Sequence, residues 1–287
     1  MDEIRKIKHT LKAVPTLEGA GVHLKRAFGS REVPDLDPFL LLDDFHSRDP
    51  EKYIKGFPWH PHRGIETITY VLHGRVEHGD SMGNKGVIAS GDIQWMTAGS
   101  GIVHQEMPKG DEDGLLWGFQ LWANLPASHK MMPPRYREIK KEDIRDLVLE
   151  NGVRVKLIAG RMNGVEGPAR DIVIDPQFLD VNLPAHGIFD HGIPQGHKAF
   201  AYVIEGQGDF EPQARKAASP ETLVLFEDGE KVNITAKDKP LRFLLISGKP
   251  LNEPISWQGP IVMNTDEELE TAFREYRNGT FLKHRGK

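Results

Sequence analysis

Cysteine is absent from the 287 residues of this chain. The absence excludes disulfide bonds, thiolate metal ligands and a cysteine nucleophile, and it fits a protein that works in the reducing cytoplasm. The sequence does contain 13 histidines, together with 42 aspartates and glutamates. Imidazole and carboxylate groups are therefore the side chains from which a metal site or acid–base chemistry must be built.

Long apolar runs are also missing. No stretch approaches the roughly 20 residues that a membrane-spanning helix needs, and the first six residues lack the apolar core of a signal peptide. Lysines and arginines number 37 against 42 acidic residues, so the formal net charge is -5. This balance argues against direct nucleic-acid binding, which normally uses a basic surface. We expect a cytoplasmic protein, or a nuclear one in a eukaryote, that does not contact membranes.

Glycine and proline are plentiful, with 29 and 20 residues, and such a composition predicts many turns. Between the turns lie short runs rich in β-branched and aromatic residues, at 67–72, 86–89, 93–97 and 115–122. Short strands separated by glycine-containing turns are typical of β-sandwiches and barrels. The sequence therefore predicts an all-β fold.

A weak internal repeat suggests a duplication. Residues 199–206 align with 67–74 at an offset of 132, and residues 229–236 align with 91–98 at an offset of 138. The segment 126–151 between the two copies contains prolines and a charged stretch, which is typical of a linker. We therefore expect two β-barrels related by duplication.

The predicted division places an N-terminal, metal-binding barrel in residues 1–133. A C-terminal barrel, with the linker at its start and a helix at its end, occupies residues 134–287. The helix is predicted because Thr265 and Glu268 have the spacing of a capping box. An apolar stripe with helical spacing follows it. Its residues are Leu269, Ala272, Phe273 and Tyr276.

Two short motifs carry the candidate chemistry. They are His60-Pro61-His62 and His104-Gln105-Glu106. Residues i and i+2 of a strand point to the same face, so each motif can offer two donors to one interior point. Three imidazoles and one carboxylate suit Fe(II) and equally Mn, Ni, Cu, Co or Zn. Four protein ligands on an octahedral ion leave open positions, which suggests reactivity.

An isolated His-x-His is more often a surface feature than a metal site, but glycine turns flank both motifs, as is common for sites at the mouth of a barrel. Glu66 competes with Glu106 for the carboxylate position. Glu66 lies four residues after His62 and has the same strand parity. Chemistry alone leaves the choice between the two glutamates open.

These segments resemble the pirin family. The similarity lies in residues 56–67, which contain the first motif, and in residues 91–108, which contain the second. Residues 37–45 and 259–265 also resemble pirin segments. Pirins belong to the cupin superfamily, so the resemblance implies two double-stranded β-helix (jelly-roll) barrels in one chain.

The resemblance also implies a ligand set. In pirins iron is held in the N-terminal barrel by residues that match His60, His62, His104 and Glu106. The position that matches Glu66 is a ligand in many other cupins but not in pirins. The family pattern therefore favours Glu106.

The C-terminal barrel lacks the corresponding donors. With the offsets of 132 and 138, the positions equivalent to the four proposed ligands are Gly192, Pro194, Arg242 and Leu244. None of these residues is a plausible metal ligand. We therefore expect no metal site in the C-terminal barrel.

The resemblance implies an enzyme of the quercetin 2,3-dioxygenase type, which cleaves a flavonol or a similar enolizable aromatic compound with O₂. A substrate hydroxyl would be acidified at the metal, and Glu106 would be the catalytic group that takes its proton. The substrate is then a small aromatic molecule, and we expect a monomer.

Another function is open on the same resemblance. Some pirins are regarded as non-enzymatic regulators that bind a protein partner, either a transcription factor or a metabolic enzyme. A change in the oxidation state of the metal would then act as the switch. A third hypothesis is a cupin isomerase or a sugar-binding protein. The pirin-like segments argue against it.

Overall fold

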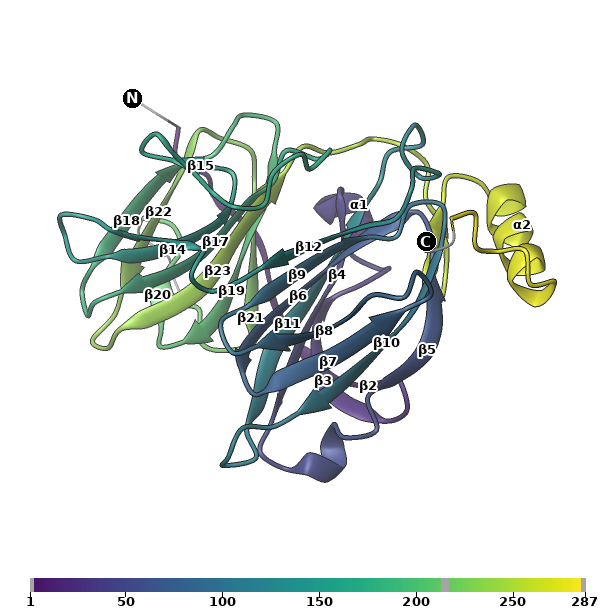
Figure 1. Cartoon of the computed structure of the whole chain (residues 1–287). Helices are drawn as coiled ribbons and strands as arrows, with labels where there is room; N and C mark the ends of the chain where they lie inside the picture. Colours follow the sequence, from purple (N-terminus) through teal and green to yellow (C-terminus); the bar gives the residue numbers. More distant parts are fainter. Residues whose placement is uncertain (1–2, 213–216, 285–287) are drawn as a thin grey trace. The chain divides into compact units, whose positions relative to one another are not determined.

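The computed structural model describes residues 3–212 and 217–284, and most of its regular structure is β-strand (Figure 1). The chain forms two compact units, each assembled from separate stretches of sequence. We name the unit made of Pro15–Ser30, Phe39–Lys141 and Leu251–Lys287 the first barrel. The unit made of Met1–Val14, Arg31–Pro38 and Glu142–Pro250 is the second barrel. The predicted all-β class is confirmed.

The first barrel consists mainly of two antiparallel sheets. Its elements are β2 (Val14–Glu18), β3 (Val22–Phe28), β4 (Phe39–Ser47), a 3-10 turn η1 (Pro50–Lys52), β5 (Phe57–His62), β6 (Ile65–His73), β7 (Arg75–Asp80), β8 (Lys85–Ala89), β9 (Ile93–Thr97), β10 (Ile102–Lys109), β11 (Leu116–Asn124), β12 (Arg135–Ile139), β24 (Ser256–Gln258), β25 (Ile261–Met263) and α2 (Asp266–Arg277). The larger sheet has the order β12-β9-β6-β11-β4-β3-β2, and the smaller one has the order β5-β10-β7-β8.

The second barrel follows the same plan. Its elements are β1 (Ile7–Lys12), α1 (Val33–Leu36), β13 (Arg145–Val148), β14 (Arg154–Ala159), β15 (Arg161–Met162), β16 (Val165–Glu166), β17 (Gln177–Leu183), β18 (Ile188–Gly192), β19 (Lys198–Glu205), β20 (Gly208–Asp209), β21 (Thr222–Phe226), β22 (Lys231–Ala236) and β23 (Leu241–Gly248). The larger sheet has the order β1-β21-β19-β23-β17-β14-β13, and the smaller one has the order β18-β22-β20.

The ends of the chain do not follow a single division at residues 133 and 134. The N-terminal strand β1 pairs with β21 and so completes a sheet of the second barrel. The C-terminal helix α2 and the hairpin β24–β25 belong to the first barrel. The segment expected to be a linker also contributes two strands, because β12 pairs with β9 and β13 pairs with β14.

The sheet orders identify the counterparts in the two barrels. β6 lies between β9 and β11, and β19 lies between β21 and β23, in agreement with the offset of 132. β22 lies between β18 and β20, as β10 lies between β5 and β7. The offset of 138 is therefore wrong, because it equates β22 with β9, a strand of the other sheet.

The strand pairing corrects the positions inferred from that offset. Gly192 pairs with Lys231 in the second barrel, as His62 pairs with Ile102 in the first. Counting from these pairs moves the counterparts of His104 and Glu106 from β23 to β22. Those counterparts are Asn233 and Thr235. The same pairs make Asp190 the counterpart of His60 and Gly192 that of His62, in place of Gly192 and Pro194.

The C-terminal helix forms as predicted. The Thr265 side chain accepts a hydrogen bond from the Glu268 backbone, and the Glu268 carboxylate accepts one from the Thr265 backbone, which completes the capping box. Leu269 and Ala272 are buried in a cluster with Ile261 and other residues of the first barrel. In the described part of the chain, no helix has the length and apolarity to cross a membrane.

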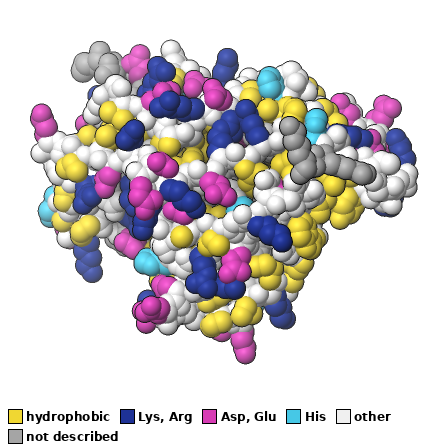
Figure 2. Space-filling model, in the orientation of Figure 1, with side chains coloured by type: hydrophobic (Ala, Val, Ile, Leu, Met, Phe, Trp, Pro, Cys, Tyr) yellow, Lys and Arg dark blue, Asp and Glu magenta, His cyan; other side chains and the backbone are white. Residues whose placement is uncertain are grey.

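Charges are mixed on the visible surface. On the face drawn in Figure 2, lysine and arginine side chains alternate with aspartate and glutamate side chains among the coloured residues. That face therefore lacks the continuous basic stripe that favours nucleic-acid binding.

Arg5 anchors the N-terminal segment in the second barrel. Its side chain is 1% exposed, and its guanidinium donates to the backbone carbonyls of Pro194, His197 and Glu227 at 2.9–3.0 Å. It also forms an ion pair with Asp228 at 3.2 Å. The guanidinium therefore links the N-terminal segment to two loops of the second barrel.

Lys130 has a comparable role in the first barrel. It is 1% exposed, and its Nζ donates to the carbonyl of Gly64, the side-chain oxygen of Asn124 and the carbonyl of Val262 at 2.7–3.0 Å. All three acceptors are uncharged, so burial dominates and lowers the pKa of Lys130 to about 7. Lys130 thereby connects the C-terminal segment to the turn that follows β5.

Replacement of Arg5 tests its anchoring role. Arg5→Ala should lower the free energy of unfolding by about 2–4 kcal/mol, because three carbonyl groups lose a charged donor. Lys8→Ala is the matched control on the same segment, since the Lys8–Asp35 ion pair is largely exposed and should cost only a few tenths of a kcal/mol. Urea unfolding of the full chain measures both. Equal losses would contradict the anchoring role.

Lys130 predicts a pH dependence of stability. Between about pH 7 and pH 10 the unfolded chain holds a lysine proton that the folded chain has lost. The free energy of unfolding should therefore rise with pH by up to about 1.4 kcal/mol per unit in this range, and this gain is lost as the pH falls through 7. Urea unfolding at pH 7, 8 and 9 should show this slope in the wild type and not in Lys130→Met. Parallel curves would refute the prediction.

Candidate metal centre

The pairing of β5 with β10 brings the two histidine motifs together. His104 is the direct cross-strand partner of His60, and Ile102 is the partner of His62. β5 has one extra residue opposite Gln105, because Glu106 pairs with Phe57. Such a bulge re-aims side chains and is common beside functional sites. The strand pairing thus places three imidazoles from two distant motifs around one point.

The three rings form a compact cluster. The donor atoms of His60, His62 and His104 all lie within 4.8 Å of one another. The ring centroids of each pair are 4.4–5.0 Å apart. His104 is fully buried, His62 is 1% exposed and His60 is half-buried. Across the described ranges 3–212 and 217–284, this is the only group of three or more such residues with the spacing of a metal site.

The hydrogen bonds of the rings leave their lone pairs facing one another. His60 Nδ1 is 2.8 Å from the carbonyl oxygen of Pro58, and His62 Nδ1 is 3.1 Å from that of Pro260. A carbonyl oxygen only accepts, so both Nδ1 atoms carry the proton and both Nε2 atoms of the neutral rings carry a lone pair. The two Nε2 atoms are nevertheless 3.0 Å apart. Two lone pairs at this distance repel unless a cation binds them both.

The distance between the His60 and His62 donor atoms fits two neighbouring ligands of an octahedral ion. With bonds of about 2.1 Å, neighbouring ligands of an octahedral ion lie about 3.0 Å apart, and those of a tetrahedral ion about 3.4 Å. The observed 3.0 Å matches the octahedral value. Both ring nitrogens of His104 are buried without a hydrogen-bond partner among the described residues, which is consistent with a residue that binds a metal.

Burial keeps two of the rings uncharged. The pKa of His62 lies well below its usual value because the ring is desolvated and His60 is close by. The pKa of His104 is lowered for the same reasons, first by burial and then by His62 and His60. A metal ligand must present a neutral imidazole. His62 and His104 are therefore ready to bind a metal at neutral pH.

Glu106 faces the cavity beside this cluster. Its Oε1 accepts a hydrogen bond from Thr69 Oγ1 at 3.0 Å, and its Oε2 accepts one from Gln120 Nε2 at 3.3 Å. Glu106 lines the same pocket as His60 and His62. Its carboxylate is thus oriented by two neutral donors and remains accessible from the cavity.

Glu66 is engaged elsewhere. Its Oε1 accepts from Thr97 Oγ1 at 2.5 Å, and its Oε2 accepts from Trp95 Nε1 at 3.0 Å. Both donors lie on β9, where Thr97 is the direct partner of Glu66. Glu66 is 1% exposed and does not line the pocket. Its two oxygens satisfy buried donors of the sheet.

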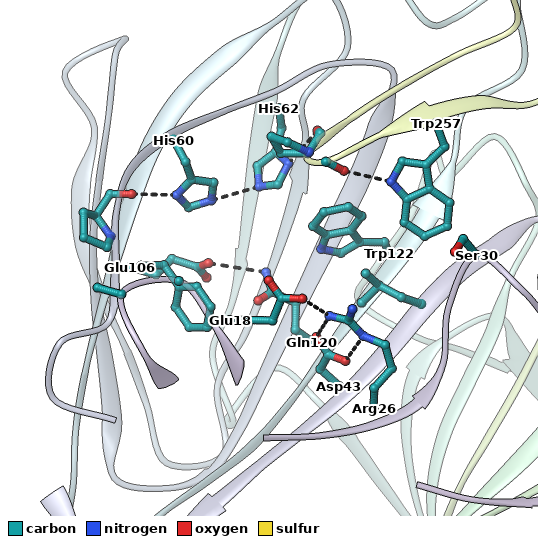
Figure 3. A pocket seen from close by; sticks show the side chains of 17 residues that line it. Glu18, Arg26, Ser30, Asp43, His60, His62, Glu106, Gln120, Trp122 and Trp257 are labelled. Atoms are coloured by element: carbon teal, nitrogen blue, oxygen red, sulfur yellow. Dashed lines mark hydrogen bonds and ion pairs between the residues drawn. The ribbon is translucent and has the colours of Figure 1, made fainter. Parts of the chain in front are cut away.

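A cavity of about 600 Å³ opens beside the histidines (Figure 3). His60, His62 and Glu106 form one part of its wall, and the indoles of Trp122 and Trp257 form another. Trp122 also packs edge-on against His62, with 5.0 Å between the ring centroids. The cavity therefore combines candidate metal donors with aromatic surfaces.

Some pocket residues carry no motif in the sequence. Gln120 lies on β11, Arg26 on β3 and Glu18 on β2, and all three line the cavity. None lies near either histidine motif along the chain. Only the sheet order, in which β11, β4, β3 and β2 are successive neighbours, brings them to one side of the site.

Comparisons with known proteins were made for the whole chain. The family model for pirin matches residues 21–123, and the model for the pirin C-terminal cupin domain matches residues 178–282. A protein of Pseudomonas aeruginosa named "Putative quercetin 2,3-dioxygenase" is 42% identical over 271 residues, which are 92% of this chain and 94% of that protein. A pirin-like protein of Caulobacter vibrioides is 42% identical and aligns with 97% of this chain and 99% of its own length.

A crystal structure of a quercetin 2,3-dioxygenase from Acinetobacter baumannii superposes with a TM-score of 0.89 and 32% identity. The match covers 97% of this chain and 98% of that structure. The similarity thus extends over both barrels and confirms that they are cupin domains. The chain belongs to the pirin family.

Proposed function

We propose that this protein is a metal-dependent dioxygenase of the quercetin 2,3-dioxygenase type, which cleaves a flavonol or a similar enolizable aromatic compound with O₂. The observation that carries the proposal is the cavity of about 600 Å³, in which metal donors and indole surfaces face the same space. Its volume lies in the range of pockets that enclose small organic ligands. The names of two relatives, from Pseudomonas aeruginosa and Acinetobacter baumannii, support the same reaction class.

The proposed metal ligands are His60, His62, His104 and Glu106. Neutral imidazoles with one carboxylate suit Fe(II), our first choice, and also suit Mn, Ni, Cu, Co or Zn. Bound there, the metal would supply a Lewis acid for a substrate hydroxyl and a centre for O₂ chemistry. The support for Glu106 over Glu66 is that Glu106 lines the cavity while both oxygens of Glu66 accept hydrogen bonds within the sheet.

Glu106 is also the proposed catalytic base. Its Oε2 is only 3.3 Å from Gln120 Nε2, a long and therefore weak hydrogen bond. That oxygen would take the proton of a substrate hydroxyl only when it is not coordinated, because a metal-bound carboxylate oxygen is a poor base, while Oε1 stays bonded to Thr69. Gln120 would then orient the carboxylate and not compete strongly for the proton.

The indoles of Trp122 and Trp257 would position the substrate. Trp122 is braced against His62, and the Nε1 of Trp257 donates to the Gly259 carbonyl at 2.8 Å, which fixes that ring in the wall. A planar aromatic molecule can stack on such surfaces. Stacking would also displace water from the reacting groups.

A redox-switched regulator is the alternative function, and one observation favours it. Trp59, next to His60, is 52% exposed, and it lies on β5, an edge strand of its sheet. An exposed tryptophan is a frequent anchor for a protein partner. A change in the oxidation state of the metal could shift Trp59, because Trp59 and His60 lie in the same bulged segment of β5. This function predicts partner binding that depends on oxidation state, without turnover.

Substitutions at the ligand positions test the enzyme. After anaerobic loading with Fe(II), the wild type should consume quercetin in air, followed by the loss of flavonol absorbance. His60→Ala should lose bound iron and reduce turnover by about 100-fold or more, because it removes a ligand. Glu106→Gln should lower metal affinity by about 10-fold or more, since losses of 10- to 100-fold follow even the removal of groups that only support a ligand.

Glu66→Gln is the matched control for Glu106→Gln. It should keep the metal content of the wild type and lower only stability, because Trp95 and Thr97 lose a charged acceptor. Metal content measured by elemental analysis decides between the two glutamates. Loss of metal in Glu66→Gln but not in Glu106→Gln would exchange their roles, and turnover by His60→Ala would refute the proposed site.

Metal binding should release few protons. His62 and His104 are already neutral at pH 7 because burial lowers the pKa of each, so neither has a proton to lose. Titration calorimetry at pH 7 in two buffers with different ionisation enthalpies should give at most about one proton per metal ion. Release of two or more protons would mean that these imidazoles are charged in the metal-free protein.

A further inference from the structure

A charged cluster lies on another side of the cavity from the rings of His60 and His62 (Figure 3). Arg26 donates from Nε and Nη2 to the two oxygens of Asp43 at 2.8 and 2.7 Å. The same Nη2 is 2.9 Å from Glu18 Oε1. The three residues come from β3, β4 and β2, which are neighbours in one sheet.

The cluster fixes Arg26 while leaving part of it available. The two parallel hydrogen bonds to Asp43, whose side chain is only 8% exposed, hold the plane of the guanidinium. Among the described residues, Arg26 Nη1 has no hydrogen-bond partner. The Arg26 side chain is 28% exposed, and Nη1 is not among the buried polar atoms. Nη1 can therefore donate to a molecule in the cavity, from a position that is set in advance.

Glu18 adds an acceptor beside this donor. Its side chain is 41% exposed, and its ion pair with Arg26 uses Oε1. The other carboxylate oxygen has no recorded partner within the described chain, so it can accept a hydrogen bond from a ligand. Donor and acceptor thus lie next to each other in the same part of the wall.

The charge of the cluster restricts what it can bind. One guanidinium faces two carboxylates, so the cluster is net negative by one unit. A carboxylate or phosphate on the ligand would be repelled by Glu18 and Asp43. A neutral pair of neighbouring hydroxyl groups is complementary, because one oxygen can accept from Arg26 Nη1 while the other hydroxyl donates to Glu18.

We propose that the Glu18–Arg26–Asp43 cluster is a specificity determinant that recognises a vicinal dihydroxyl group on the ring of the substrate remote from the metal donors. The proposal rests on the proposed function for the metal end of the substrate and extends it to the other end. The cavity then selects aromatic compounds with an ionisable hydroxyl at one end, a flat middle that stacks on Trp122, and a neutral catechol at the other end.

Paired flavonols test this recognition. Quercetin carries two neighbouring hydroxyls on its outer ring, and galangin is the same flavonol without them. The Fe(II)-loaded wild type should favour quercetin by about 10- to 30-fold in kcat/KM, the effect of two ordinary hydrogen bonds. Anaerobic binding, followed by quenching of tryptophan fluorescence, should show the same order without turnover.

Glu18→Met should reduce the preference to within about threefold, mainly through weaker use of quercetin. Glu77→Met is the matched control, because Glu77 is also 41% exposed and ion-paired, with Lys109, but lies on β7 outside the cavity. It should keep the wild-type ratio. Arg26→Lys keeps the charge but loses the planar guanidinium, so it should also reduce the ratio of kcat/KM for quercetin to that for galangin. Circular dichroism would verify that each variant is folded.

The outcomes separate this inference from the proposed function. Equal affinities of the wild type for quercetin and galangin would overturn the specificity cluster even if both were consumed. A wild-type preference that Glu18→Met and Arg26→Lys leave unchanged would also overturn it. If neither flavonol is consumed but quercetin binds more tightly in the wild type and not in Glu18→Met, the cluster stands as a ligand site and the dioxygenase function falls.

Discussion

The antiparallel pairing of β5 with β10 is the constraint on which the site depends. It places His104 opposite His60, while the alternation within β5 turns His62 to the same side as His60. A slip of one residue would turn the donors of one strand away from the centre. The hydrogen bonds from Nδ1 to the carbonyls of Pro58 and Pro260 then aim the Nε2 lone pairs inward. Sheet register and ring orientation together bring the Nε2 lone pairs of His60 and His62 close to each other. A bound cation would remove the repulsion between them.

The orientation of His62 depends on a segment almost 200 residues away. Pro260 lies just before β25, and Lys130 holds that strand by its hydrogen bond to Val262. Arg63, the neighbour of His62, donates to the carbonyl of Phe281 and pairs with Glu275. The C-terminal segment therefore supports the orientation of His62 in the candidate metal centre. This arrangement agrees with the general finding that groups behind the ligands hold a metal site in shape.

Much of the fold and the core of the site could be predicted from sequence because the signals are local. Alternation in short strands, the capping box at Thr265 and the spacing of the two histidine motifs each lie within a few residues. Features that depend on pairing between distant segments could not be predicted. The hydrogen bonds that Glu66 accepts come from donors on β9, Arg26 reaches the cavity only through the sheet order, and β1 joins the second barrel by pairing with β21. The false offset of 138 has the same origin, because a short alternating strand resembles any other.

The two barrels share a fold but differ in the side chains that they bury. The interior of the second barrel is filled by apolar side chains such as Phe189, Phe210 and Phe243, which need no partners. The second barrel also buries polar side chains, among them Asp180 and Ser247, but the first barrel buries Glu66, Thr97 and Gln94 in addition to the histidines. Each buried polar group costs free energy unless it is hydrogen-bonded. The hydrogen bonds from Thr97 and Trp95 to Glu66 therefore offset the cost of burying this carboxylate in the first barrel. They satisfy buried polar groups of the barrel interior, as the hydrogen bonds of Thr69 and Gln120 do for Glu106.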